Sequence, residues 1–595
     1  MTDPTPLADG FAPVDRAQWR ELVAAALRRS RGEVAADDVE RLLATPTDDG
    51  YAVHPLYTAA DVAASPPPHD PGRFDFVRGT FPADESIDWD VRARHWLDEA
   101  SAEAVRDDLA NGVTSLWLTD GHPDRLTDVL AGVDLARVPV VVEGFRSGHR
   151  LAQALLQHDL NPGSSLGLDP LGLVAATRRS GDIDDAVDLA GEAQAAGIGA
   201  FVIDGSVYHD AGASFAEELG AVTATGLATL RLLEDRGMSI DDAARLIEFR
   251  LVVTDDQFAS IAKLRAARIL WARVLQVAGA GTDHGQRQHA TTSLAMLTVR
   301  DPWVNLIRNT VAAFAGGVGG AEAVTVEPHT AATGEVDPFA RRMARNTQLL
   351  LLQESHVGFV ADPAGGSYYV ETRTRQLAEA GWSWLRDIEA AGGMRAALDA
   401  GVVAKRIERT WERRAERTAK RQAPITGVSE FPDRERGAKA AAPDRSGDGL
   451  PRHRYAEVFE VLRDRADALA APPTVALVTV GPLSRHGARQ TFAENLFAAG
   501  GIATVPVPFV AGEPLRLPEG VGVVCVCGAD DDYPDAIPAI GAAAQEAGVT
   551  RLLVAGRPGA RAEADTAAGV TDHIYAGCDA VALLDQVLTQ MEVPA

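Results

Sequence analysis

Short apolar runs rich in β-branched residues alternate with longer segments of helical periodicity along most of the chain, beginning at Val113. Ala213–Arg236 and Gln257–Leu275 are the clearest of the helical segments. Eight strands that alternate with helices indicate a (β/α)8 TIM barrel, a fold of typically ~250 residues. The candidate strands are Val113–Leu118, Val138–Val142, Ser165–Leu168, Ala200–Ile203, Phe249–Thr254, Gln288–Ser293, Ala323–Val326 and Val357–Val360.

The last part of the chain repeats the strand-and-helix pattern on a smaller scale. Five candidate strands fall within ~120 residues, and a helical pattern follows each of them except the second, which is typical of a flavodoxin-like, doubly wound α/β domain. The strands are Val475–Val480, Ala503–Pro508, Val521–Val526, Arg551–Val554 and His573–Tyr575, and the helices are roughly Ala488–Ala499, Ala536–Ala547, Ala560–Ala568 and Ala580–Met591.

The opening of this second domain is the first place to look for a ligand. The strand Val475–Val480 breaks at Gly481-Pro482, and a helical pattern takes over at Ala488 and closes at Gly500-Gly501. Open α/β sheets bind ligands in the crevice at the carboxyl ends of their strands. We therefore expect a loop at Pro482–Gly487, placed where a ligand would bind.

The residues outside these two domains are predicted to form an N-terminal arm and an inter-domain linker. The helical patterns Arg16–Arg29 and Ala36–Leu43 are too small for an independent core, and Pro66-Pro67-Pro68 follows them. We expect an arm that wraps a partner or the main domain, with a partly ordered tail as the alternative. Ile425–Leu450 is rich in Pro, Gly, Asp and Arg and is predicted to be a linker. The predicted domains are the arm (1–70), the barrel (71–415), the linker with a connecting helix (416–470) and the α/β domain (471–595).

Composition narrows the functional classes. The 595 residues carry a formal net charge of -27, which argues against a nucleic-acid or membrane-surface role because phosphates repel such a surface. Three cysteines cannot build a disulfide framework. The N-terminus has neither a basic nor an apolar targeting region, and no apolar run approaches the ~20 residues that cross a bilayer. We expect a cytoplasmic protein.

Tyr208-His209 is the candidate catalytic pair within the barrel. It follows the strand Ala200–Ile203, which is fourth in the predicted order, and barrel enzymes carry catalytic groups at the carboxyl ends of their strands. Such a pair can serve as an acid and a hydrogen-bond donor. The alternative is a loop pair satisfied by backbone contacts.

Other candidate sites carry less information. His284, Arg287 and His289 lie close to the predicted sixth strand and can bind a phosphate or carboxylate, or can be ordinary rim residues. The glycine run 316–320 matches no phosphate-binding motif and is explained by a tight helix-to-strand turn. Cys525 and Cys527 share one face of a strand without further ligands at metal-binding spacing, so we interpret them as core thiols.

The most specific stretch is Asp337–Glu371, in which a predicted helix, Phe339–Glu354, precedes a short strand and a Pro-Ala-Gly-Gly turn. It resembles the signature region of the methylmalonyl-CoA mutase family, with Met343 where the family usually has Ile. Similar segments elsewhere extend the resemblance over nearly the whole chain, and it implies a barrel, a linker and a cobalamin-type domain. The matching elements are 342–348, 353–355, 362–363 and 365–371, together with Phe76–Gly79, Ile261–Arg268, Arg287–His289, Thr292-Ser293, Leu297-Thr298 and Asp301.

The family contains catalytic chains and smaller partner chains without a working active site, and the barrel of this chain resembles the latter. Catalytic chains continue after Phe-Val-Arg-Gly into a Thr-Met-Tyr segment whose tyrosine contacts substrate, whereas this chain continues Thr80–Asp84 without that tyrosine. A Thr-Ile-Gln-Asn-Asp segment of catalytic chains is replaced by Leu168–Val174. Tyr208-His209 resembles the catalytic pair, but aligning on Ala211–Ala213 shifts it by two residues.

The opening loop of the second domain departs from the family in the same direction. Catalytic chains carry Asp-x-His-x-x-Gly there, and the resemblance assigns that His to cobalt and the Asp to orienting the His. Aligning on Gly487 places Pro482 at the Asp and Ser484 at the His, while His486 comes two positions too late. Serine has no imidazole lone pair for cobalt, and proline has no carboxylate. The acidic run 530–532 near Gly528 discourages a phosphate-bearing nucleotide tail.

The resemblance therefore implies the small, structural subunit of a heterodimeric, adenosylcobalamin-dependent methylmalonyl-CoA mutase. The large subunit would bind the cofactor and interconvert methylmalonyl-CoA and succinyl-CoA. We expect no catalytic, cofactor-binding or metal site on this chain, with Pro482, Ser484 and Gly487 as a degenerate cobalamin loop. Two alternatives stay open: a catalytic acyl-CoA mutase chain that uses Tyr208, His209 and His486, and a scaffold or chaperone for another cobalamin enzyme.

Overall fold

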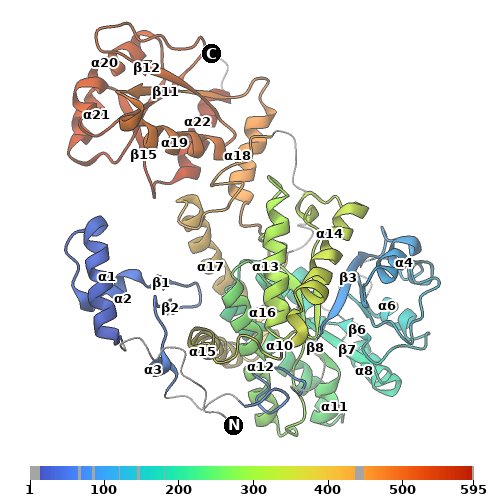
Figure 1. The fold of residues 1–595 in the computed structure, drawn as a ribbon. Helices are drawn as coiled ribbons and strands as arrows, with labels where there is room; N and C mark the ends of the chain where they lie inside the picture. Colours follow the sequence, from blue (N-terminus) through green and yellow to red (C-terminus); the bar gives the residue numbers. More distant parts are fainter. Residues whose placement is uncertain are drawn as a thin grey trace.

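The computed structural model describes residues 14–63, 69–82, 88–119, 121–143, 148–179, 181, 183–435 and 448–592. Eight parallel strands close into a barrel in the order β10-β3-β4-β5-β6-β7-β8-β9, and a five-stranded parallel sheet follows as a second domain (Figure 1). The predicted fold class is confirmed. The barrel strands are β3 (Asp90–Trp96), β4 (Ser115–Thr119), β5 (Val140–Val142), β6 (Ser165–Leu168), β7 (Gly199–Asp204), β8 (Ile247–Val253), β9 (Arg287–Thr292) and β10 (Ala323–Thr325).

The predicted set of barrel strands differs from the structure in two places: it omits the first strand, and its last member is not a strand. The first strand, β3, was missed because its alternate residues Arg92 and Arg94 are charged although both point into the protein. The predicted strand Val357–Val360 is instead a 3-10 turn, η4 (Val357–Phe359). Periodicity cannot distinguish so short an apolar run from a turn. Tyr208 and His209 consequently follow the fifth barrel strand, not the fourth.

The helices form a ring around the barrel, and α15 (Tyr368–Ala390) adds an outer layer on α10 (Phe215–Glu234) and α12 (Gln257–Ala278). Glycine makes this close packing feasible, since a Cβ at Gly220 would stand 2.6 Å from the Trp384 ring. The other helical elements are α4 (Ala102–Ala110), α5 (Arg125–Val129), α6 (Gly148–Leu155), α7 (Pro170–Thr177), α8 (Ile183–Ala196), α9 (Ser206–His209), α11 (Ile240–Arg245), α13 (Val304–Val318), η2 (Ala331–Thr333), α14 (Pro338–Leu349), η3 (Leu350–Glu354), α16 (Met394–Asp399) and α17 (Val402–Ala419).

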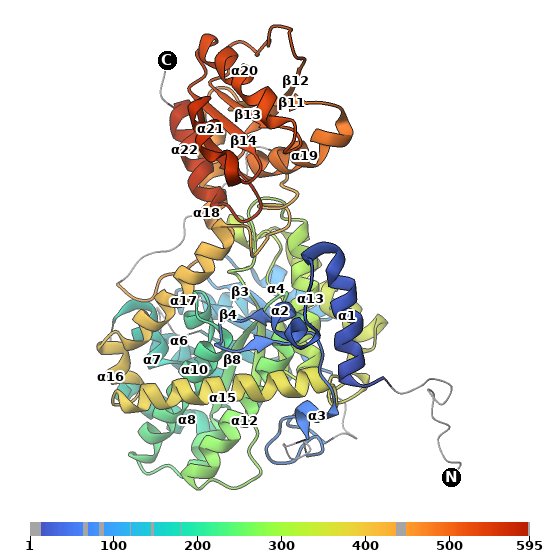
Figure 2. The same cartoon turned by 90° about the vertical axis from the view of Figure 1, so that its left-hand side faces the viewer.

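The N-terminal segment projects from one side of the barrel (Figures 1 and 2). Ion pairs and a hydrogen bond attach this segment to the barrel helices. Asp48 pairs with Arg414 and Arg417 of α17, and Asp49 accepts a hydrogen bond from the Ala216 amide at the start of α10. The predicted break at Pro66–Pro68 lies outside the described residues. The elements of this segment are α1 (Arg16–Arg31), η1 (Ala36–Asp38), α2 (Val39–Leu43), β1 (Thr45–Pro46), β2 (Ala52–Val53) and α3 (Ala59–Val62).

The second domain has the strand order β12-β11-β13-β14-β15, with a hydrophobic core on each face of its sheet. The connecting helix α18 (Glu457–Ala468) fastens it to the barrel, because Arg300 pairs with Asp464 and Asp467 and Glu460 accepts from the Val299 amide. Among the described helices, none has the length and apolarity to cross a bilayer. The remaining elements are β11 (Thr474–Val480), α19 (Leu483–Ala499), β12 (Ala503–Phe509), β13 (Val523–Cys527), α20 (Tyr533–Glu546), β14 (Arg551–Ala555), η5 (Gly559–Arg561), α21 (Ala562–Ala567), β15 (Val570–Ile574) and α22 (Ala580–Glu592).

Candidate functional site

The barrel interior is filled by buried ion pairs. Arg92 of β3 reaches Glu248 of β8 at 2.7 Å, although these strands are not neighbours. Arg94 pairs with Glu327 at 2.8 Å, and all four side chains are largely buried. Burial favours the neutral acid, but Arg92 and Arg287 lower the pKa of Glu248 and keep it ionised. These charged pairs are part of the packed core that fills the interior of a TIM barrel.

An aromatic ring completes this filling. Trp117 of β4 is 2% exposed and lies between two guanidinium groups, with the Arg250 carbon 3.7 Å and the Arg94 carbon 4.3 Å from its ring centroid. Arg250 comes from β8, diametrically opposite β4, and pairs with Asp204 at 2.6 Å. The stack therefore spans the barrel, and cation–π attraction between desolvated groups stabilises it.

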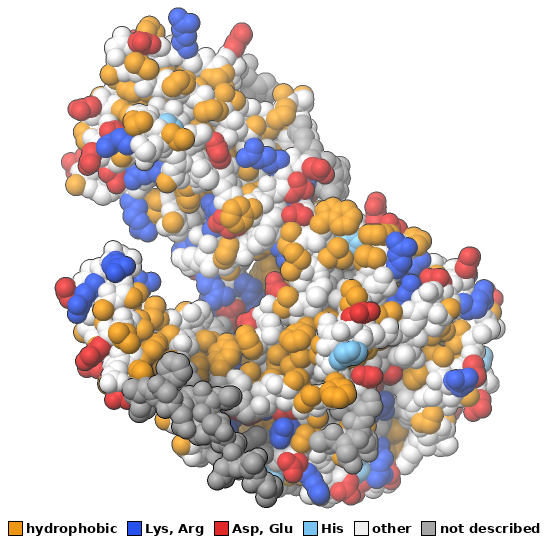
Figure 3. All heavy atoms as spheres, in the orientation of Figure 1, with side chains coloured by type: hydrophobic (Ala, Val, Ile, Leu, Met, Phe, Trp, Pro, Cys, Tyr) orange, Lys and Arg blue, Asp and Glu red, His pale blue; other side chains and the backbone are white. Residues whose placement is uncertain are grey.

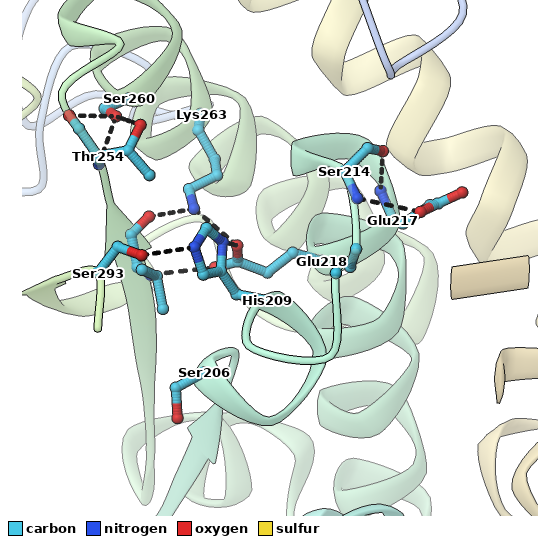
Figure 4. A network of polar contacts seen from close by, with 12 residues as sticks. Ser206, His209, Ser214, Glu217, Glu218, Thr254, Ser260, Lys263 and Ser293 are labelled. Carbon is cyan, nitrogen blue, oxygen red and sulfur yellow. Dashed lines mark hydrogen bonds and ion pairs between the residues drawn. The ribbon is translucent and has the colours of Figure 1, made fainter. Parts of the chain in front are cut away.

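The structure buries the candidate pair Tyr208-His209. The Tyr208 hydroxyl lies 3.2 Å from Thr225 of α10, and burial raises the pKa of Tyr208 beyond its usual range. His209 lies 2.9 Å from the Ser293 hydroxyl and 3.3 Å from the Glu218 carboxylate (Figure 4). Lys263 completes this network by pairing with Glu218 at 2.7 Å. Both candidate side chains thus face protein groups, with no more than 1% of either exposed.

The candidate anion-binding residues around the seventh barrel strand, β9, do not converge on one binding site. His284 pairs with Asp241 at 2.9 Å, and Arg287 lies 3.4 Å from Glu248. His289 is buried in the barrel, where its Nε2 lies 2.8 Å from the Thr325 hydroxyl. Burial and the neighbouring arginines place the pKa of His289 well below its usual value. These residues contact groups of the chain itself instead of converging on an anion site.

The linker crosses the carboxyl-end face of the barrel, where barrel enzymes bind their substrates. The backbone amide of Leu450 donates to Ala175, that of His453 to Asp210 and that of Tyr455 to Ala295. These acceptors follow three different strands, β6, β7 and β9. The stacked rings of His453 and Trp411, 4.1 Å apart, fix the segment against α17.

The prediction of a loop at Pro482–Gly487 was wrong, because most of this stretch is helical. Pro482 is the N-cap of α19, and the helix begins at Leu483, so only Gly481 and Pro482 separate it from β11. Ser484 lies in the first helical turn and is exposed, and His486 turns back so that its Nδ1 lies 3.0 Å from the Gly481 carbonyl. The first turn carries few apolar residues, which is why periodicity placed the start later.

Tyr533 fills the crevice at the carboxyl edge of the sheet, and sequence reasoning missed it. Its hydroxyl accepts from the Gly528 amide at 2.9 Å and donates to the Ala555 carbonyl at 2.6 Å, bridging the ends of β13 and β14. Its ring is fully buried, with the guanidinium carbons of Arg489 and Arg561 at 5.1 and 4.6 Å from its centroid. Tyrosine in the first position of a helix gives no sequence signal of such a contact.

The two cysteines of β13 are buried core thiols, and burial raises the pKa of Cys525 well above its usual value. Within the described ranges, no cluster of three or more His, Cys, Asp or Glu residues is arranged to hold a metal ion. The glycine run is part of α13 and the turn after it: a Cβ at Gly317 would stand 2.2 Å from the Trp89 ring, and Gly320 has a φ of +83°.

Several signature residues hold the fold together. Arg265 of α12 pairs with Asp362 and with Glu371 of α15, and Arg78 reaches the same Asp362 at 2.9 Å. Arg268 donates to the carbonyl oxygens of Phe76, Val77 and Gly319. These motifs connect the segment before the barrel with two of its helices, so their presence maintains the architecture.

Together these features define a (β/α)8 protein with an appended doubly wound domain, in which residues 450–455 cross the carboxyl-end face of the barrel and Tyr533 fills the crevice of the second sheet. A sequence model described as "Methylmalonyl-CoA mutase" matches residues 186–480. The chain is 43% identical to the methylmalonyl-CoA mutase small subunit of Streptomyces virginiae, over 99% of this chain and 98% of that protein. It belongs to the methylmalonyl-CoA mutase family.

Two other relatives differ in how much of the chain they match. The methylmalonyl-CoA mutase small subunit of Propionibacterium freudenreichii subsp. shermanii is 36% identical over 84% of this chain and 82% of that protein. The methylmalonyl-CoA mutase of Rhizobium meliloti (strain 1021) is 35% identical over only 38% of this chain and 32% of that protein. Similarity to the small subunits thus extends much further along the chain.

Proposed function

We propose that this chain is the non-catalytic small subunit of a heterodimeric methylmalonyl-CoA mutase. A large subunit binds adenosylcobalamin and interconverts methylmalonyl-CoA and succinyl-CoA, and this chain supplies folding stability and an interface. The observation that carries the proposal is that the chain's own groups occupy both ligand positions: residues 450–455 cross the carboxyl-end face of the barrel, and Tyr533 occupies the crevice of the second domain. We place the heterodimer in the cytoplasm.

The residues at the cobalamin position do not fit a cobalamin. A lower cobalt ligand needs an imidazole nitrogen held by a second polar group, but Pro482 and Ser484 supply neither. The adjacent carboxylates Asp530 and Asp532 are paired with Arg489 and Arg485, so this edge is closed by the chain's own ion pairs. We therefore assign the cofactor to the partner chain.

The catalytic alternative would use Tyr208, His209 and His486. The first two are buried against Thr225, Ser293 and Glu218, and the third turns back to its own backbone in the other domain. None of these contacts leaves the group facing a ligand. This arrangement favours a structural role for all three.

The N-terminal arm is a candidate for contacts with the large subunit. Its helix α1 packs on α2 and η1, and only Ala24 of α1 is buried. An arm with so little core of its own gains from a partner. Deleting residues 1–60 should weaken the heterodimer, and an unchanged dissociation constant would refute this part of the proposal.

The whole proposal is tested by reconstitution. The full-length chain alone, mixed with adenosylcobalamin, should show neither a bound-cobalamin spectrum nor turnover of methylmalonyl-CoA. Co-expressed with the large subunit, it should co-purify in a defined ratio, and the complex should turn over. Turnover by the isolated chain would establish the catalytic alternative, and co-purification with a different cobalamin enzyme would establish a scaffold role.

A further inference from the structure

The surface helix α13 has an outer face without charge. Its only charged residue is Arg308, which is 6% exposed and turned inward to Thr298 and Asn305. The outward positions carry Trp303, just before the helix, and Ile307, which are 61% and 65% exposed. Surface helices normally present charged and polar residues to water, as α8 does with its exposed Asp184, Asp185, Asp188 and Glu192.

The fold itself does not require these outward apolar side chains. The inner face of α13 packs through small residues: Ala312 and Ala315 are fully buried, and a Cβ at Gly316 would stand 3.2 Å from that of Ala290. Trp303 and Ile307 point away from that contact. The packing of α13 against the barrel therefore does not depend on these two side chains.

Further aromatic residues extend this surface on both sides of α13. At one end, Trp303 stacks on His329 at 5.4 Å and meets Phe339 edge-on at 6.4 Å. On the other side, Tyr369 contacts Phe258 at 5.3 Å and Tyr57 at 5.2 Å. Figure 3 shows hydrophobic side chains gathered across this face of the barrel. We call the set Trp303, Ile307, Phe339, Phe258 and Tyr369 the apolar band.

Two clefts indent the band. One, of about 770 Å³, has an apolar wall of Val304, Ile307 and Val311 and a wall of the arm residues Thr45–Asp49. Its remaining lining includes the charged residues Asp255, Asp256, Arg308, Arg373, Arg414 and Arg417. The other, of about 650 Å³, lies between His54–Tyr57 and Phe258, Tyr368 and Tyr369. Both have the size of pockets that receive side chains or small ligands. Anchor residues that fill such pockets, most often Trp, Tyr and Arg, dominate the energy of protein interfaces.

We infer that the apolar band is the docking surface for the large subunit, which contacts it with uncharged aliphatic and aromatic side chains. The inference rests on the proposed function, which supplies the partner. The band is continuous with the arm, since residues of the arm form walls of both clefts. A second copy is disfavoured as the occupant, because each copy carries a net charge of -27 and the two would repel. A stable interface buries about 800 Å² on each partner, which is more than five side chains cover. We therefore expect the interface to extend beyond the band, with the band as its apolar centre.

The test compares single substitutions in the full-length chain, with the large subunit of the same organism as the probe. Ile307→Asp and Trp303→Asp place a charge at exposed positions and should each weaken heterodimer affinity at least tenfold. Val461→Asp is the matched control, because Val461 of α18 is an exposed (58%) aliphatic residue outside the band. The melting temperatures of the isolated Ile307→Asp and Val461→Asp variants should match that of the wild type, whereas Trp303→Asp also loses the ring contacts with His329 and Phe339.

The outcomes separate the two proposals. If the wild type binds the large subunit and Ile307→Asp binds equally well, the band is not the docking surface, and the proposed function stands. If the wild type does not bind, the proposed function fails and the inference with it. If the isolated chain forms a dimer that Ile307→Asp dissociates, the band belongs to a second copy, and the inference is overturned.

Discussion

The guanidinium carbon of Arg250 lies 3.7 Å from the centroid of the Trp117 indole, although the two residues come from opposite strands of the barrel. The second domain repeats this arrangement, with Tyr533 between Arg489 and Arg561. In each case an aromatic ring lies against two arginines that pair with neighbouring carboxylates, inside the barrel and at the carboxyl edge of the second sheet respectively. Burial and cation–π attraction within these clusters stabilise the two domains.

Replacing Trp117 with alanine should destabilise the isolated chain by about 3–5 kcal/mol, the range for deleting a large buried aromatic side chain. The loss has two causes, a cavity on the barrel axis and two arginines deprived of the ring between them. Equilibrium denaturation in urea measures it. Phe359→Ala is the control, because Phe359 is 87% exposed and its loss should change stability by less than about 0.5 kcal/mol. Equal effects at the two positions would show that the Trp117 stack does not support the barrel.

Tyr533→Phe should lower the stability of the second domain by about 1–3 kcal/mol. The substitution keeps the ring but removes the hydroxyl, so the Gly528 amide and the Ala555 carbonyl lose a buried partner. Denaturant unfolding followed by a probe in the second domain measures the change. The same substitution at the exposed Tyr368 is the control and should be nearly neutral. A neutral Tyr533→Phe would mean that water satisfies both backbone groups.

The comparison between sequence and structure shows where pattern reasoning works in this fold. Seven of the eight barrel strands carry enough apolar residues to be recognised, and all five strands of the second domain were predicted within a few residues. β3 was missed because Arg92 and Arg94 face a lumen that pairs them with acids, and periodicity assumes that inward residues are apolar. The same charged interior explains why the filling of the barrel could not be predicted.

For the candidate sites, the sequence shows residue types but not tertiary contacts. That Pro482 and Ser484 carry no imidazole is visible in the sequence, since it depends only on residue type. The role of Tyr533 depends on a contact between the first residue of α20 and the ends of two strands, and only the folded chain shows it. Equally, the burial of His209 between α9, α10 and β9 follows from tertiary packing, not from its place after a strand.

Stability should depend on the protonation of Asp210. Burial raises the pKa of this carboxyl to about 7, with Arg452 opposing the rise and Asp204 adding to it. The unfolded chain titrates near pH ~3.9. Between these two values the folded chain holds a proton that the unfolded chain has lost, so stability falls as pH rises from about 4 to 7.

Asp210→Asn removes this titration and should therefore gain stability relative to the wild type as pH rises. The difference in unfolding free energy between variant and wild type should be larger at pH 8 than at pH 5, by on the order of a few kcal/mol. Urea unfolding at both pH values measures it, and Asp188→Asn on the exposed face of α8 controls for the lost charge. A difference that does not change with pH would show that Asp210 is ionised throughout.

Restoring the family's metal-binding pair should not restore activity. A variant with Pro482→Asp and Ser484→His should fold, because aspartate is a favourable N-cap for α19. Its histidine would stand on the exposed first turn of a helix beside a crevice that Tyr533 still fills. The proposed function also implies that the barrel lacks the substrate contacts of catalytic chains. We expect neither a cobalamin spectrum nor turnover from this variant in isolation. Adding Tyr533→Ala tests whether the tyrosine blocks the crevice, because cobalamin binding that appears only in the triple variant would identify Tyr533 as the barrier. Turnover by the double variant alone would contradict the structural role of this chain.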